Sequence, residues 1–87
     1  MKTDTITFSG ATPIDILAQN LNRTYASIQN LGSDTIYVAG SSNMTRDTSF
    51  TLLPGDTITT SFYVGSYFAI GSDNVSGVST LCLIEEE

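Results

Sequence analysis

Hydrophobic and polar residues alternate along most of the chain, in runs too short for helices. In residues 57–64, Ile58 and Phe62 fall on one face of the segment, whereas Tyr63 falls on the opposite, Thr- and Ser-rich face. Residues 5–8 and 24–29 show the same alternation. A period of two residues is typical of a β-strand with one buried face. The pattern therefore predicts a β protein.

Clusters of turn-forming residues separate these runs. Asn30–Asp34 is one cluster, and we expect the strand before it to form a hairpin with residues 35–39. Pro54-Gly55 suits the two central positions of a type II turn. The spacing predicts an all-β fold of about seven to eight strands: a small antiparallel β-sandwich, Ig-like or jelly-roll-like, or a β-barrel.

The inward faces of these strands predict the core, and the chain reads as one domain. We expect an N-terminal arm or edge strand over 1–13, a β-sandwich over 14–84 and a solvated acidic tail over 85–87. The predicted core residues are Phe8, Ile16, Ile28, Ile36, Val38, Phe50, Leu52, Ile58, Phe62, Phe68, Ile70, Val78 and Leu81.

The charge excludes some classes of partner. The 87 residues carry a net charge of −6, half of it from Glu85, Glu86 and Glu87. Such a balance argues against nucleic-acid binding, which depends on Lys and Arg. No apolar run is long enough to span a membrane, and the start of the sequence does not resemble a signal peptide. A domain this small buries a modest core, so we expect it to dock onto a partner.

The residue types argue against catalysis. The chain has no His and one Cys, so neither a Cys/His zinc site nor a Ser-His triad can form. Cys82 lies in an apolar stretch and is expected to be buried. Most of the Asp residues fall in predicted turns, where Asp caps backbone groups. We expect no enzyme activity and no cofactor.

The tyrosines leave a second interpretation open. Tyr25, Tyr37, Tyr63 and Tyr67 either pack within the sheets or line a sugar-binding face. Tyr63 is the one expected to be partly exposed, because it shares a strand face with Thr and Ser. A carbohydrate-binding β-sandwich module is therefore an alternative function.

One stretch carries a resemblance to a known group of proteins. In residues 23–32, RTYASIQNLG, an Arg opens a strand that ends in an Asn-x-Gly turn, and the strand TIYVA follows at 35–39. With LLPGD at 52–56 and YFAIG at 67–71, the sequence resembles small virion proteins of tailed bacteriophages, head decoration (cement) proteins above all. The resemblance implies a non-enzymatic protein that binds the outer head surface across capsid subunits and stabilises the shell. A tail, connector or fibre module is the alternative within the virion.

The resemblance also implies partners and a location. The partner would be the major capsid protein or another virion protein. The chain itself would form a homo-oligomer, foremost a trimer, and would bind neither nucleic acid nor a membrane. The protein would be made in the host cytoplasm and reside on the capsid surface. Two segments are our candidates for the contact, the N-terminal segment, as an added strand, and the loop at 41–47, where Met44 is expected to be exposed. The contact residues we expect are Thr5, Ile6, Thr7, Phe8, Pro13, Asn43, Met44 and Arg46.

Overall fold

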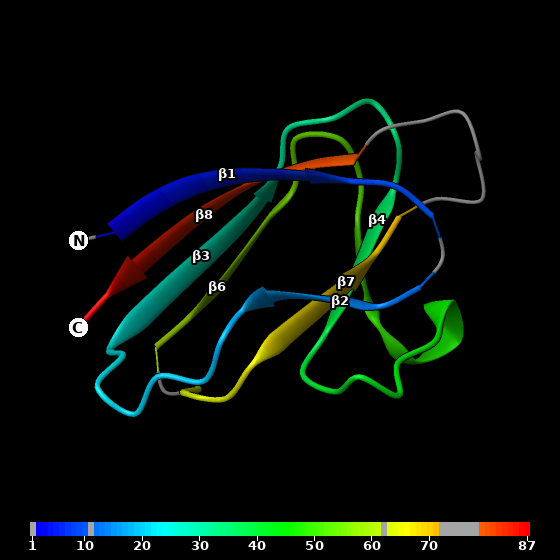
Figure 1. Cartoon of the computed structure of the whole chain (residues 1–87). Coiled ribbons are helices and arrows are strands. Elements are labelled where there is room, and N and C mark those ends of the chain that lie inside the picture. Colours follow the sequence, from blue (N-terminus) through cyan, green and yellow to red (C-terminus); the bar gives the residue numbers. More distant parts are fainter. Residues whose placement is uncertain (1, 11, 62, 72–78) are drawn as a thin grey trace.

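Alternating side chains build two sheets that bury their inner faces against each other. The computed structural model describes residues 2–10, 12–61, 63–71 and 79–87, with the side chain of Arg46 left out. Over these residues it contains eight strands and one 3-10 helix (Figure 1). They are β1 (Lys2–Phe8), β2 (Ile14–Leu17), β3 (Tyr25–Asn30), β4 (Ile36–Ala39), η1 (Arg46–Thr48), β5 (Phe50–Leu52), β6 (Thr57–Thr60), β7 (Tyr67–Ile70) and β8 (Ser79–Glu86).

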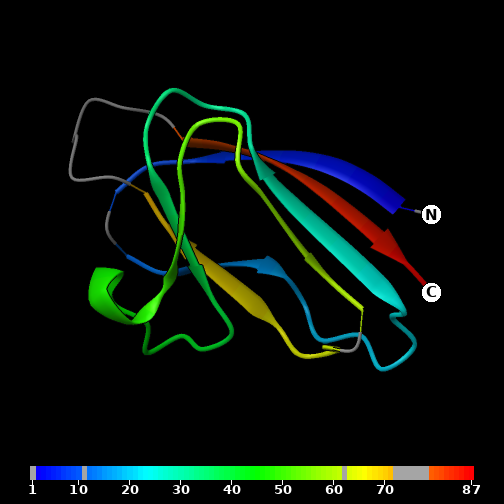
Figure 2. The ribbon, with the colours of Figure 1, turned by 180° about the vertical axis from the view of Figure 1, so that it is seen from behind.

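The topology is that of a jelly roll. One four-stranded sheet has the order β1-β8-β3-β6 and the other has the order β2-β7-β4-β5. The first strand of the chain pairs with the last, the second with the seventh, the third with the sixth and the fourth with the fifth, all antiparallel. A long hairpin that is wound around the core gives this order. The predicted all-β sandwich is confirmed, and the jelly-roll-like form is the one adopted. Figures 1 and 2 show the two layers from opposite sides.

Most of the predicted core is confirmed. Ile16, Ile28, Ile36, Val38, Leu52, Ile70 and Leu81 are buried, while Phe8 and Ile58 are partly buried and pack against the core. Phe50 was predicted wrongly: it is 68% exposed, because its end of β5 lies at an open side of the sandwich. Phe68 is half-buried because Tyr67 and Ala69 are the β7 residues that join the core cluster. Phe62 and Val78 lie outside the described residues.

The predicted hairpin of β3 with β4 is wrong. β3 pairs with β6 and β8, whereas β4 belongs to the other sheet and pairs with β5 and β7. The turn between them instead carries the chain from one sheet to the other. Asn30, fully buried, shapes this crossing: its amide nitrogen donates to the carbonyls of Asp34 (2.8 Å) and Leu52 (2.9 Å), and its oxygen accepts from Gly32 N–H (2.9 Å).

The turn between β5 and β6 has the predicted type. Gly55 has a φ of +89°, which the second central position of a type II turn requires. Asp56 N–H donates to the carbonyl of Leu53 at 2.9 Å and closes the turn. The Asp56 carboxylate in turn accepts from Leu53 N–H at 3.0 Å. This turn also crosses between the sheets, so both edge strands β5 and β6 end up on the same side of the sandwich.

Both ends of the chain belong to the first sheet. Residues 2–8 form the edge strand β1, which pairs with β8 over its whole length. Glu85 and Glu86 are the last residues of β8, so the expectation of a solvated tail is wrong for Glu85, which is 7% exposed. The reason is alternation, since Glu85 shares the inward face of β8 with Leu81 and Leu83. Within the described residues, no helix has the length and apolar character to cross a membrane.

Candidate functional site

The first group of predicted contact residues is built into the sheet. Thr5 and Thr7 are exposed, but Ile6 and Phe8 alternate with them, are half-buried and pack against the core. All four pair with β8. Thr5 and Thr7 are thus the more exposed side chains of this group, and the contact itself stays a prediction.

The second group lies on the other sheet, around the connection from β4 to β5. The prediction that Met44 is exposed is wrong: it is 6% exposed, because the chain turns back on itself here, with Met44 N–H bonded to the Ser41 carbonyl at 3.2 Å. Asn43 is exposed, and Arg46 begins η1. Pro13 is half-buried directly before β2. With Met44 buried, the loop does not expose the apolar side chain expected at its centre.

A buried arginine, which the sequence did not single out as functional, ties together several distant segments. Arg23 is 4% exposed, and its Nε donates to the Glu85 carboxylate at 2.7 Å. Its terminal nitrogens donate to the carbonyls of Ala18 at 2.6 Å and of Gly65 at 2.8 Å. Its guanidinium also lies 5.9 Å from the centre of the Tyr67 ring. The rigid fork of donors on Arg suits such a multiple contact.

The partner of this arginine stays ionised. Burial alone would raise the pKa of Glu85, but the hydrogen bond and charge of Arg23, together with Asn20 and Lys2, outweigh burial and lower the pKa below its ordinary value. The ion pair therefore holds β8 to the loops that follow β2 and β6. This buried pair accounts for the fixed positions of these segments.

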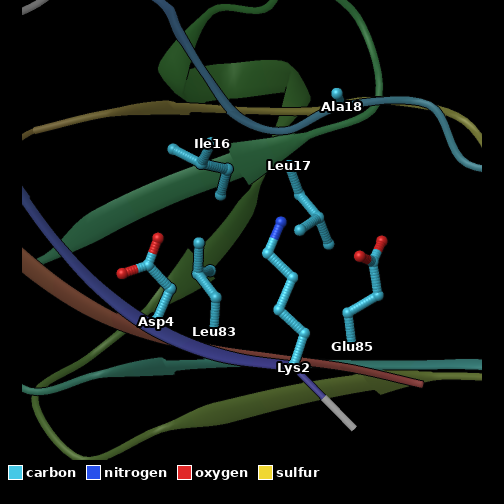
Figure 3. A pocket seen from close by; sticks show the side chains of 7 residues that line it. All are labelled: Lys2, Asp4, Ile16, Leu17, Ala18, Leu83 and Glu85. Atoms are coloured by element: carbon cyan, nitrogen blue, oxygen red, sulfur yellow. The ribbon is translucent and has the colours of Figure 1, made fainter.

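One open side of the sandwich, where β1 lies over β2, carries charges that point inward. A small cavity of about 90 Å³ opens there (Figure 3). Lys2 extends from β1 towards Leu17 across the gap between the sheets, with Asp4 and Glu85 on either side of it. We call this side the charged edge. Its lining residues are Lys2, Asp4, Ile16, Leu17, Ala18, Leu83 and Glu85.

The opposite open side, where β6 lies over β5, has a different chemistry. A groove of about 410 Å³ runs along it, and none of the described residues that line it is charged. Phe50 projects from β5 and is 68% exposed. We call this side the uncharged edge. Its lining residues are Gly40, Phe50, Ile58, Thr59, Thr60, Tyr63 and Tyr67.

The tyrosines of this groove are held in place. Tyr63, 39% exposed, has its ring against Gly65 and Gly40, where an added Cβ would come within 2.5 Å and 2.7 Å of the Tyr63 hydroxyl. The hydroxyl bonds to the Ser66 carbonyl at 3.0 Å. The ring meets Tyr67 edge-on, with centroids 4.9 Å apart. An aromatic ring that is exposed yet fixed loses little entropy when a partner covers it.

The sequence pointed to part of this groove. It placed Tyr63 on an exposed face, which is confirmed, but it assigned Phe50 to the core. Tyr63 and Tyr67 meet in the groove, whereas Tyr37 lies on β4 and Tyr25 on β3, in different sheets. The four tyrosines thus form no continuous row. Because the groove joins strands from both sheets, no local sequence pattern could have predicted it.

Comparison with known proteins adds information on the fold. The sequence matches no protein-family model and no curated protein. Among solved structures, the chain is similar to a de novo designed double-stranded β-helix, with a TM-score of 0.63, 13% identity and coverage of 99% of this chain and 100% of that one. It is also similar to the cupin domain of Drosophila melanogaster CENP-C, with a TM-score of 0.57, 14% identity and coverage of 97% of this chain.

A second Drosophila structure, CENP-C bound to CAL1, gives a TM-score of 0.59 and 15% identity over 97% of this chain. The chain spans about three fifths of the length of each CENP-C chain, at 60% and 59%. These likenesses show a cupin-like, double-stranded β-helix fold. Within the part of the chain that the structure describes, no group of three or more His, Cys, Asp or Glu side chains is placed to hold a metal ion.

Proposed function

We propose that this chain is a non-enzymatic structural protein of a tailed-bacteriophage virion, a decoration protein that binds the outer head surface across capsid subunits. The observation that carries the proposal is the uncharged edge. There a fixed Tyr63 and an exposed Phe50 flank a groove in a chain whose net charge is −6. Exposed apolar side chains that gather around a groove mark a contact surface more often than isolated ones do.

The fold supports a role in protein binding. A domain of 87 residues has a modest core, so surface that becomes buried on docking adds substantially to its stability. In a Drosophila structure of similar fold, CENP-C is bound to CAL1. We infer that this chain uses its sandwich in the same general way, as a module whose partner is a protein.

The residues of the phage resemblance have structural roles. Arg23 lies two residues before β3, and Asn30 is the last residue of that strand. Both are buried and hydrogen-bonded to several segments. The motif therefore supports a shared fold and leaves the docking residues to be found elsewhere. It is the combination of this motif with the uncharged edge that favours a virion protein.

The proposed role needs geometry rather than chemistry. A protein that binds only the assembled shell stabilises that shell by mass action, by an amount that grows with its concentration relative to Kd. Many copies act together, so each contact can be weak. We propose a trimer around local symmetry axes, with the major capsid protein as the partner.

The test is to mix the purified chain with expanded, undecorated heads of the phage that encodes it. We expect saturable co-sedimentation and a higher temperature of head disruption at saturation. Isolated tails from the same phage serve as the matched control. Binding to tails and not to heads would assign the chain to the tail or fibre instead, and binding to neither would contradict a virion role.

A further inference from the structure

The uncharged edge has the form of a site for an extended strand. Building on the function proposed above, we propose that an uncharged, extended segment of the partner protein adds to β6 as a further strand of the first sheet. Its alternate side chains would then enter the groove beside Phe50 and Tyr63. This mode of recognition combines backbone hydrogen bonds at a sheet edge with side-chain pockets.

The groove follows the backbone of β6. Ile58, Thr59 and Thr60 are successive residues, and their side chains alternate between the two faces of the sheet, yet all three line the groove. The groove must therefore run along the free edge of the strand and not over one face. β6 pairs with β3 on its other side, and among the described strands it is the last of its sheet.

The other edge strand of the same sheet differs in a way that favours this choice. Proteins protect free edges with inward-pointing charges, bulges and charged side chains. At the charged edge, Lys2 and Asp4 point inward from β1, and the register of β2 shifts between Asp15 and Leu17. β6, with the sequence Thr-Ile-Thr-Thr, carries none of these features. An edge without such charges or bulges can accept a further strand.

The groove also defines the chemistry of the incoming segment. The residues that line it are aromatic, aliphatic or hydroxyl-bearing, so an aliphatic or aromatic side chain fits and a charged one would lose its hydration without gaining a counter-charge. The net charge of −6 further disfavours acidic segments. We therefore expect an uncharged strand with apolar residues at every second position.

The experiment uses two variants of the full chain that make the same chemical change. Phe50→Lys places a charge in the groove, and Leu21→Lys places one at a loop residue that is 75% exposed, against 68% for Phe50. Both residues are exposed enough for the fold to tolerate the change. The probe is a displayed library of twelve-residue peptides, selected for binding to the wild-type chain and against binding to Phe50→Lys. Changes in the NMR shifts of the chain then show where a selected peptide binds.

We expect the selected peptides to be uncharged, with apolar residues at every second position, and to change the NMR shifts of Thr57–Thr60 most. Phe50→Lys should weaken peptide binding about tenfold or more, whereas Leu21→Lys should bind within about twofold of the wild type. Peptides that map elsewhere, or no enrichment, would overturn the proposal. So would a glycan array on which a neutral sugar binds the wild type but not Phe50→Lys. Concentration-dependent NMR shifts at β6 without peptide would identify a second copy as the occupant and overturn it as well.

Head binding by the two variants separates this proposal from the proposed function. If wild type, Phe50→Lys and Leu21→Lys all bind heads equally, the decoration role stands and the strand site is wrong. If no variant binds heads while the peptides still map to β6, the strand site stands and the virion role is wrong.

Discussion

The charged and the uncharged edge lie on opposite sides of the same sandwich and close it in different ways. At the charged edge, Lys2, Asp4 and Glu85 turn inward, and Arg23 neutralises the buried carboxylate. At the uncharged edge, aromatic rings and threonines line an open groove. In one sheet, β1 thus carries inward-pointing charges and β6 carries none. This difference is the basis of our proposal that the partner binds at the uncharged edge.

Arg23 connects the two edges, and its loss should have the largest effect. Arg23→Ala would remove the guanidinium that pairs with the buried Glu85 carboxylate and that donates to the carbonyls of Ala18 and Gly65. We expect a loss of about 3–5 kcal/mol in the free energy of unfolding, which is a large fraction of the stability of a domain this size. Denaturant unfolding followed by circular dichroism measures it.

Arg23→Lys is the matched control, because it keeps the charge and loses the fork of donors. We expect a stability between those of the wild type and Arg23→Ala. If the free energy of unfolding of Arg23→Ala equalled that of the wild type, this would contradict the structural role of the ion pair.

Asn30 holds the end of β3 next to the uncharged edge, and its loss should have the next largest effect. Asn30→Ala would remove the side-chain partners of the Asp34 and Leu52 carbonyls and of Gly32 N–H. Leaving such buried groups unpaired should cost about 2–3 kcal/mol. Asn30→Asp keeps the acceptor for Gly32 N–H, but it places a carboxylate oxygen against the Asp34 and Leu52 carbonyls, where Asn30 has a donor. It should therefore be no more stable than Asn30→Ala in the same unfolding experiment.

Lowering the pH should destabilise the domain through the charged edge, by less than the Arg23 and Asn30 substitutions do. The folded state lowers the pKa of Glu85 below its ordinary value of 4.5. The Arg23–Glu85 pair therefore contributes its full stability above that value and loses it as pH falls through the lower pKa of the folded state. Urea unfolding between pH 7 and pH 3 should show this decline. Glu85→Gln should be less stable at pH 7 and decline less steeply, and parallel curves for both proteins would contradict the assignment.

Strand alternation and turn residues predicted the sandwich, the type II turn at Pro54-Gly55 and most of the core. Alternation alone cannot tell which strands share a sheet, so β3 and β4 were paired wrongly. It also cannot detect that β5 is an edge strand at an open side of the sandwich, which is why Phe50 was assigned to the core. Glu85 was misread because a run of three acidic residues is typical of a tail, whereas its burial depends on Arg23, 62 residues away.

The candidate site was predicted less well, because it too depends on contacts between segments that are far apart in the sequence. The N-terminal residues Thr5 to Phe8 do form an edge strand, but the charges that protect that edge point inward and become visible only once β1 lies over β2. The groove needs Phe50, Ile58 and Tyr63 to converge from separate segments. Tyr63 on its polar face was the one local signal of it.

A cryo-EM map of heads saturated with the purified chain tests the central claim most directly, because it shows which side of the sandwich meets the capsid. The account predicts that β5 and β6 face the shell, that a capsid segment lies beside β6 and that β1 points away. A map in which β1 and its exposed threonines meet the capsid, with the groove open to solvent, would contradict it.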